Sequence, residues 1–155
     1  MVVKLSELSQ TPALKSQLVA DVLHLIDAQV AAKKGVSGLA LKGAYRVVKG
    51  LGSDYLPGVV GRLLPDALTA LEPLWVEGEA AGDPVAYVDQ HRDRAADTLL
   101  TITDRKAQGA NSVVRSVYQK FRDSIQPDVA AAMPAIAAVL QPYTQAEPTA
   151  TPSGS

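Results

Sequence analysis

Two short segments of the sequence repeat one pattern of basic and aromatic residues. Spacing of i, i+3 and i+7 places the members of each set on one face of a helix. A basic–aromatic–basic face can hold a phosphate or a carboxylate, and arginine can do so bidentately. Alternatively, the tyrosine rings belong to the core and the basic stems lie beside them. The candidate binding residues are Lys42, Tyr45, Lys49, Arg115, Tyr118 and Arg122.

An acidic segment, DQHRDRAAD, has the residue types of a metal site. Asp89, Asp93 and Asp97 are spaced by four and share a helical face, whereas His91 lies about 200° around the helix from Asp89. Oxygen ligands suit Mg²⁺ or Ca²⁺, but one helix face does not surround an ion. We therefore predict no metal site, and a solvated face paired with the neighbouring arginines.

Catalytic patterns are weak. His24 has Asp21 and Asp27 at i−3 and i+3, which suits a base, but it lacks an evident nucleophile partner. Ser37 in GVSGL does not match G-x-S-x-G, and KGLGSD matches neither a P-loop nor a dinucleotide fingerprint. No catalytic residue and no cofactor is predicted from these patterns.

The chain that must position these residues has 155 residues, of which 47% are hydrophobic and only 5% are aromatic. This length predicts one domain, and the abundance of Ala, Val and Leu favours closely packed helices. Cysteine is absent, so thiolate chemistry is excluded. The N-terminus lacks an apolar signal-peptide region, and the longest apolar run, residues 129–140, is too short to span a bilayer. We expect a cytoplasmic protein without a transmembrane segment.

Helical periodicity predicts an all-α domain over residues 1–144, with six main helices and no strand. Thr11 with Pro12, Asn111, and the turn Gly82–Pro84 mark helix starts, and Ser37 is predicted to cap the second helix. A long helix is expected to follow the Gly82–Pro84 turn and reach Gly109. Pro127 is expected to open the last helix. Residues 145–155 are predicted to form a disordered tail because they are poor in apolar residues.

The predicted helices follow one order twice: long, short and proline-kinked. Pro65 and Pro73 are eight residues apart, as are Pro134 and Pro142. We therefore predict a six-helix bundle of two three-helix pseudo-repeats, residues 12–76 and 87–144, with proline-kinked third helices. Trp75 is expected near their shared core.

Charge is unevenly distributed along the chain. Residues 1–62 carry a net +4, residues 63–104 a net −7 and residues 105–155 a net +2, within a total of −1. Such segmentation can steer a partner, or it can reflect oppositely charged neighbouring helices. Nucleic acid is disfavoured as a partner by the slightly negative total and by the lack of a recognised binding motif.

Three stretches, GVSGLALKGAY, LLPDALTALEPLW and TLLTITDRKA, resemble a family of small bacterial proteins known only as a domain of unknown function. The resemblance covers roughly residues 4–143, and the "LP…ALEP" element with the following aromatic residue is its most specific part. It implies a compact bacterial cytoplasmic domain and transfers no site residue.

Three functional classes remain. The leading hypothesis is a non-enzymatic helical interaction or scaffold module, binding another protein or itself, because each catalytic pattern fails. The first alternative is a carrier of a small apolar or amphipathic ligand between helices. The second alternative is an enzyme of unrecognised type.

Overall fold

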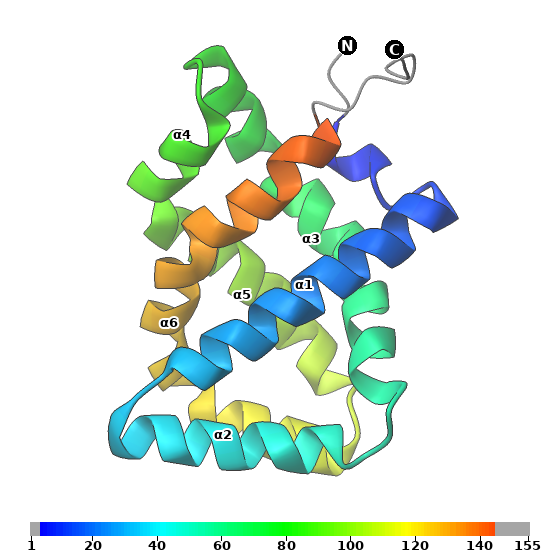
Figure 1. The fold of residues 1–155 in the computed structure, drawn as a ribbon, viewed down its shortest axis with the longest axis vertical. Helices are drawn as coiled ribbons and strands as arrows, with labels where there is room; N and C mark the ends of the chain where they lie inside the picture. The colour runs from blue at the N-terminus through cyan, green and yellow to red at the C-terminus, as the bar shows by residue number, and fades with distance from the viewer. Residues whose placement is uncertain (1–3, 145–155) are drawn as a thin grey trace.

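The computed structural model describes residues 4–144, which form a bundle of helices (Figure 1). A short 3-10 helix, η1 (Leu5–Glu7), precedes six α-helices, and residues 4–144 contain no strand. The predicted all-α class with six main helices is confirmed. The predicted tail, 145–155, lies outside the described residues. The helices are α1 (Pro12–Ala32), α2 (Gly35–Lys49), α3 (Tyr55–Ala80), α4 (Pro84–Gln90), α5 (Arg92–Gln108) and α6 (Ser112–Thr144).

Local capping chemistry determines several helix ends as predicted. α1 begins at Pro12 with Thr11 as its N-cap. The Asp83 carboxylate accepts a hydrogen bond from the Ala86 N–H at 3.1 Å and starts α4. Asn111 accepts from the Val114 N–H at 3.0 Å and starts α6. The Asp83 and Asn111 side chains satisfy backbone donors that have no intrahelical partner, whereas Thr11 makes no side-chain capping bond and α1 starts with Pro12.

Two predicted helix boundaries are wrong. Ser37 does not cap α2, because that helix already begins at Gly35, whose φ of +80° turns the chain into α2 after the extended residues Lys33 and Lys34. The long helix expected to reach Gly109 is two helices, since His91 (φ −114°, ψ 33°) separates α4 from α5. At this break the Arg92 Nε donates to the Asp89 carbonyl at 3.3 Å, which supplies a partner for a helix-end acceptor.

The last two predicted helices form the single helix α6, which includes Pro127, Pro134 and Pro142. Proline removes one backbone donor and crowds the preceding turn, so it bends a helix without always ending it. α6 bends accordingly (Figure 1). Its first part, residues 112–126, crosses the lower end of the molecule, and its second part rises along the bundle.

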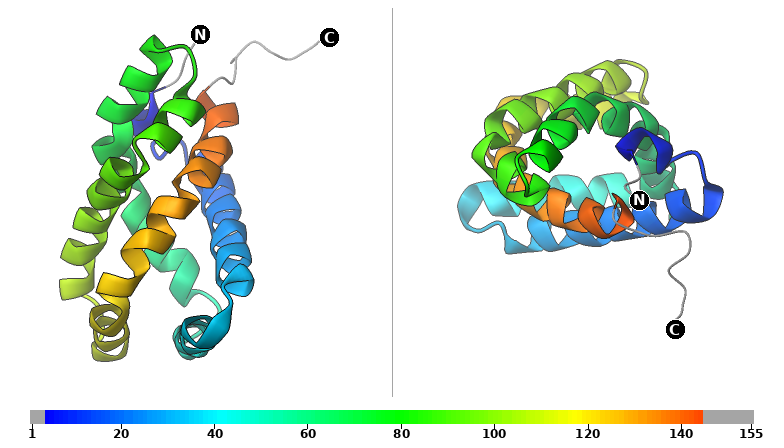
Figure 2. Two further views of the ribbon diagram at one scale, coloured as in Figure 1. Left: turned by 90° about the vertical axis from the view of Figure 1, so that its left-hand side faces the viewer. Right: turned by 90° about the horizontal axis from the view of Figure 1, so that it is seen from above.

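The helices are arranged so that α2 and the first part of α6 both lie across one end of the molecule (Figures 1 and 2). Long, short and kinked elements follow in the same order in each half: α1, α2 and α3, then α5 and the two parts of α6. Superposition of residues 12–76 on 87–144 stays a prediction.

Apolar side chains from η1, α1, α3, α4, α5 and α6 form one core. Trp75 is only 3% exposed and belongs to this core, as expected. Its indole Nε1 has no hydrogen-bond partner among the described residues. Beside it is an apolar cavity of about 10 Å³, lined by Leu5, Val88 and Met133 among others, which is about the space of one water molecule.

Candidate functional site

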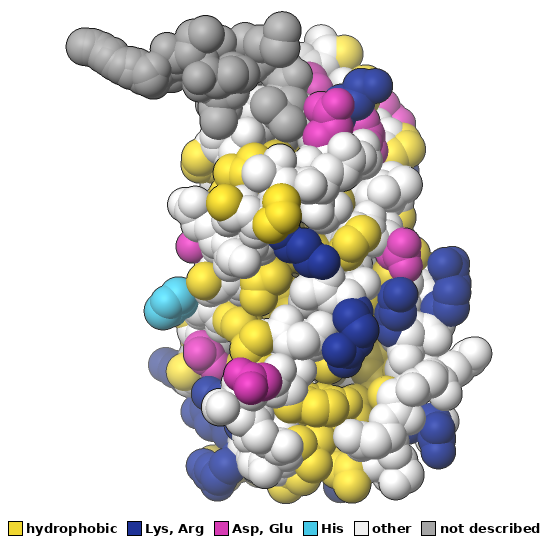
Figure 3. Space-filling model, turned by 90° about the vertical axis from the view of Figure 1, so that its right-hand side faces the viewer, with side chains coloured by type: hydrophobic (Ala, Val, Ile, Leu, Met, Phe, Trp, Pro, Cys, Tyr) yellow, Lys and Arg dark blue, Asp and Glu magenta, His cyan; other side chains and the backbone are white. Residues whose placement is uncertain are grey.

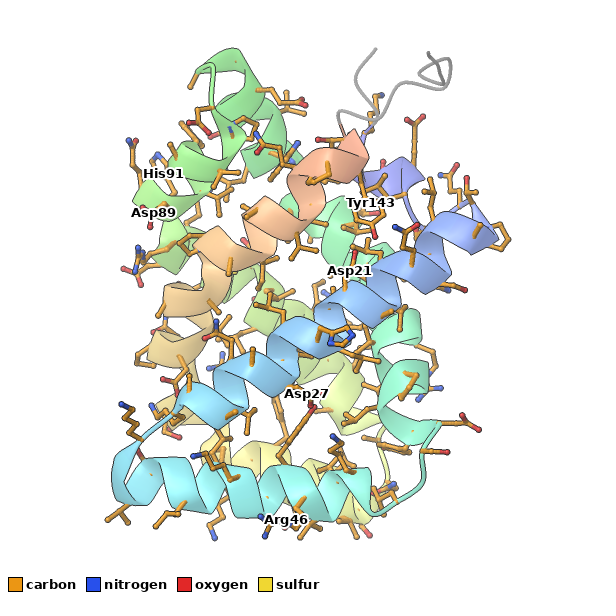
Figure 4. The ribbon with its side chains drawn as sticks, viewed as in Figure 1. Asp21, Asp27, Arg46, Asp89, His91 and Tyr143 are labelled. Carbon is orange, nitrogen blue, oxygen red and sulfur yellow. The ribbon has the colours of Figure 1, made fainter. Side chains whose placement is uncertain are left out.

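The first predicted set meets a carboxylate of α1. Tyr45 on α2 donates its hydroxyl proton to Asp27 Oδ1 at 2.5 Å, and Lys49 Nζ lies 3.4 Å from the same oxygen. Figure 4 shows Asp27 directed from α1 toward α2. Lys49 also lies over the Tyr45 ring, 5.2 Å from its centroid. We call Asp27, Tyr45 and Lys49 the first clamp, because they join two helices through one carboxylate.

The second predicted set makes the equivalent contact in the other half. Tyr118 on α6 donates to Asp104 Oδ1 of α5 at 2.6 Å. Arg122 binds the same carboxylate bidentately, from Nε to Oδ1 at 2.6 Å and from Nη2 to Oδ2 at 3.1 Å. Asp104, Tyr118 and Arg122 form the second clamp. Arg122 makes two charge-assisted bonds to its carboxylate, at 2.6 and 3.1 Å, whereas Lys49 makes one contact at 3.4 Å, so this clamp is the tighter of the two.

The clamps show what four of the six predicted residues do in the fold. Each tyrosine and the base four residues after it hold a carboxylate of the chain itself. The remaining two are placed differently: Lys42 is half-buried, and Arg115 is exposed with its Nη1 3.4 Å from the Ala110 carbonyl. Binding of an external anion by these six residues stays a prediction.

Hydrogen bonding and burial lower the pKa values of the clamp aspartates and raise those of the clamp tyrosines. The bond from Tyr45, with help from Lys49, lowers the pKa of Asp27, and the Arg122 guanidinium lowers the pKa of Asp104. Burial, followed by the bond to Asp27, raises the pKa of Tyr45. Burial and Asp104 raise the pKa of Tyr118 to about 12. At neutral pH the carboxylates are charged and the phenols protonated, which suits a structural link better than proton transfer near pH 7.

Alkaline pH should weaken the second clamp. The raised pKa means that folded Tyr118 retains its proton between about pH 10, the unfolded value, and about pH 12. The hydrogen bond from protonated Tyr118 to Asp104 therefore stabilises the folded state fully below pH 10. Its contribution is lost as the pH rises toward the folded pKa of about 12. We expect Tyr118→Phe to be less stable than wild type at neutral pH. Between about pH 10 and pH 12, its free energy of unfolding should fall less than that of the wild type. Urea unfolding at a series of pH values measures this, and parallel losses in both proteins would contradict it.

An open cleft of about 540 Å³ lies between the end of α5 and the first part of α6. The second clamp lines it, together with Arg115 and Asp123 of α6. Its wall therefore carries both signs of charge. A ligand here would meet Arg115 as the more accessible cation, since Arg122 already holds Asp104.

The acidic segment near His91 does not form one continuous face. Asp89 lies near the C-terminal end of α4 and forms an ion pair with Arg92. Asp93 and Asp97 belong to α5. The His91 ring contacts the Tyr87 ring, with centroids 4.3 Å apart. Within residues 4–144 no group of three or more His, Asp or Glu side chains is arranged to hold a metal ion.

The outer face of α2 is apolar and exposed. Val36, Leu39 and Val47 are 84%, 71% and 53% exposed. They lie opposite Gly38 and Tyr45, which face the bundle. An added Cβ at Gly38 would lie 2.5 Å from the Lys33 carbonyl oxygen, so the inner face of α2 packs tightly on the chain leaving α1. Sequence reasoning missed this surface because α2 has apolar residues on both faces.

The fold and the two clamps define a small all-α bundle whose short transverse segments are tied to the long helices by half-buried tyrosines. A model for a family of unknown function, DUF6918, matches residues 5–144, so the chain belongs to that family. Comparison with curated proteins found no significant match, and comparison with solved structures also found none. Among the described helices, none is both long and apolar enough to cross a membrane.

Proposed function

We propose that this protein is a non-enzymatic interaction module that contacts its partner through the end formed by α2 and the first part of α6. We call this end, with the adjoining end of α5, the basic end. The main support for this proposal is the exposed apolar outer face of α2. Exposed apolar side chains clustered on one helix are typical of interaction surfaces. The bacterial cytoplasm, which the resemblance implies, is the proposed location.

The basic end also carries charge that selects the partner. Between Asp27 and Asp54 the chain has five basic residues and no acidic one. Between Asp104 and Asp123 it again has five basic residues and no acidic one. Two copies meeting through this end would bring like charges together, so a partner of opposite charge fits better than a second copy. A nucleic acid backbone would satisfy the charge but leave Val36 and Leu39 in water.

The other two functions are weaker proposals. A carrier needs an internal space far larger than the cavity of about 10 Å³ beside Trp75. An enzyme needs groups with pKa values near the working pH, whereas the clamp groups have values moved away from it. The exposed face of α2 supports neither role.

Site-specific photo-crosslinking in the cell that naturally makes the protein tests the module. A photo-reactive residue replaces Leu39 in one version and Val76, which is 51% exposed on α3 at the other end, in a matched control. We expect abundant crosslinks to a protein or to lipid from position 39 and few from position 76. Equal yields at the two positions, or none at position 39, would remove the support for this function.

A further inference from the structure

The protein is electrically polarised along its length. The basic end carries two acid-free segments, while residues 66–97 hold eight acidic and only two basic side chains. On the face shown in Figure 3, most of the visible Lys and Arg side chains lie in the lower half, whereas Asp and Glu side chains gather near the top with a few lower down. A charge distribution of this kind orients a molecule in front of an anionic surface, with the basic end forward.

Many cations at the basic end have no acidic partner within the described residues. Lys33, Lys49, Lys106 and Arg122 make ion pairs. The cations at this end without such a pair among residues 4–144 are Lys34, Lys42, Arg46, Arg105, Arg115 and Lys120. Figure 4 shows Arg46 directed away from α1 at the lower edge of α2. These charges remain available to an external anion.

α2 combines this charge with the exposed apolar face. Viewed down the helix, Val36, Leu39 and Val47 lie on the outer side, and Arg46 flanks them. Leu51, 40% exposed, extends the apolar side beyond the end of the helix. An apolar stripe with flanking basic side chains is the pattern of a helix that lies in the interface of a membrane. The helix crosses the end of the molecule, so its whole length can meet a flat surface (Figure 2).

We propose that the basic end binds the surface of a lipid bilayer that contains anionic phospholipids, with α2 lying in the plane of the headgroups. This inference rests on the proposed function and identifies the partner. Val36, Leu39 and Val47 enter the boundary between headgroups and acyl chains. Lys34, Arg46 and the cations on the first part of α6 remain at the level of the phosphates, where long basic side chains can extend.

A bilayer fits these observations better than an acidic protein does. The outer face of α2 is a convex helix surface with small and medium-sized apolar residues and no aromatic anchor on it. Protein interfaces concentrate their energy in aromatic and arginine residues set in pockets. A fluid bilayer needs no matching pocket, and it contacts α2 and the neighbouring part of α6 together. The acidic end then faces away from the anionic surface.

A fluorophore on a single cysteine tests the proposal, because the chain has no cysteine of its own. Leu39→Cys and, as matched control, Val76→Cys carry an environment-sensitive dye. Each is mixed with vesicles of equal parts phosphatidylglycerol and phosphatidylcholine, or of phosphatidylcholine alone. We expect a blue shift and a rise in emission only for position 39 with the phosphatidylglycerol vesicles. Salt at about 1 M should reverse it, because the Debye length falls to about 3 Å.

Co-sedimentation of unlabelled protein with the same vesicles measures the strength of binding. We expect Leu39→Asp to weaken binding about tenfold or more, the scale of losing one inserted leucine, whereas Val76→Asp should bind like wild type. Circular dichroism confirms that both variants fold. Binding that ignores phosphatidylglycerol, or equal binding by the two variants, would overturn the proposal. Photo-crosslinks from position 39 to a protein, without vesicle binding, would overturn the bilayer inference while leaving the interaction module intact.

Discussion

Replacing Trp75 with alanine should lower the free energy of unfolding by about 3–5 kcal/mol, the largest effect that we expect from one substitution. The ring is 3% exposed and packs where α3, α4 and α6 meet. Truncation removes a large apolar surface and enlarges the cavity beside Leu5 and Met133. Neighbouring helices recover only part of this loss, since their backbones are held by their own contacts. Urea unfolding followed by circular dichroism measures the change.

Two controls separate burial from a general effect in α3. Val76→Ala, at the next position, should change stability little because Val76 is 51% exposed. Trp75→Phe should cost less than Trp75→Ala, since it keeps a ring and removes an indole N–H that has no partner among the described residues. As the sole tryptophan, Trp75 should also emit at the short wavelengths of a buried indole. Emission typical of water, with Trp75→Ala as stable as Val76→Ala, would show this account to be wrong.

Gly78→Ala should destabilise the protein by about 1–3 kcal/mol, although alanine normally favours a helix. An added Cβ at Gly78 would lie 2.8 Å from Pro84 Cα and 3.0 Å from Tyr87 Cβ. These atoms are close to the backbone of α4, so they cannot rotate away. α4 would have to move off α3, which would strain the hydrogen bond from Tyr87 to Glu77 (2.8 Å).

The matched control is Gly61→Ala in the same helix. Its Cβ would meet only the Lys15 Cε at 3.9 Å, an ordinary contact. We therefore expect Gly61→Ala to raise the free energy of unfolding by about 0.5–1 kcal/mol, the usual helix preference of alanine over glycine. Comparison of urea midpoints and slopes tests the pair. If both substitutions stabilise the protein, the close contact between α3 and α4 does not exclude a side chain at position 78.

The clamps explain why a protein with so few aromatic residues places tyrosines between its helices. The core consists mainly of Ala, Val and Leu, which pack without directional preference. A tyrosine hydroxyl bound to one carboxylate specifies which helix lies beside which. In each half this bond connects a short transverse helix to the preceding long one. The orientation of the basic end therefore depends on two polar contacts as well as on apolar packing.

Local features of the sequence determined much of the secondary structure. Thr11 with Pro12, Asp83 and Asn111 start helices because their effects act within a few residues. Helical periodicity likewise predicted the class of fold and the burial of Trp75. Residue spacing alone also predicted that each tyrosine and its basic neighbour share one face of a helix.

Only the tertiary structure decided the partners of those residues. Asp27 and Asp104 lie 18 and 14 residues before their tyrosines, on other helices, so the helix crossings bring them together. Packing of α4 on α3 accompanies the break at His91, and α6 continues through Pro127 because one lost backbone bond is less costly than exposing its apolar face. α2 has apolar residues on two faces, and its contact with the end of α1 leaves Val36 and Leu39 outside. Spacing determines which side chains share a face, whereas the packing of helices determines what that face meets.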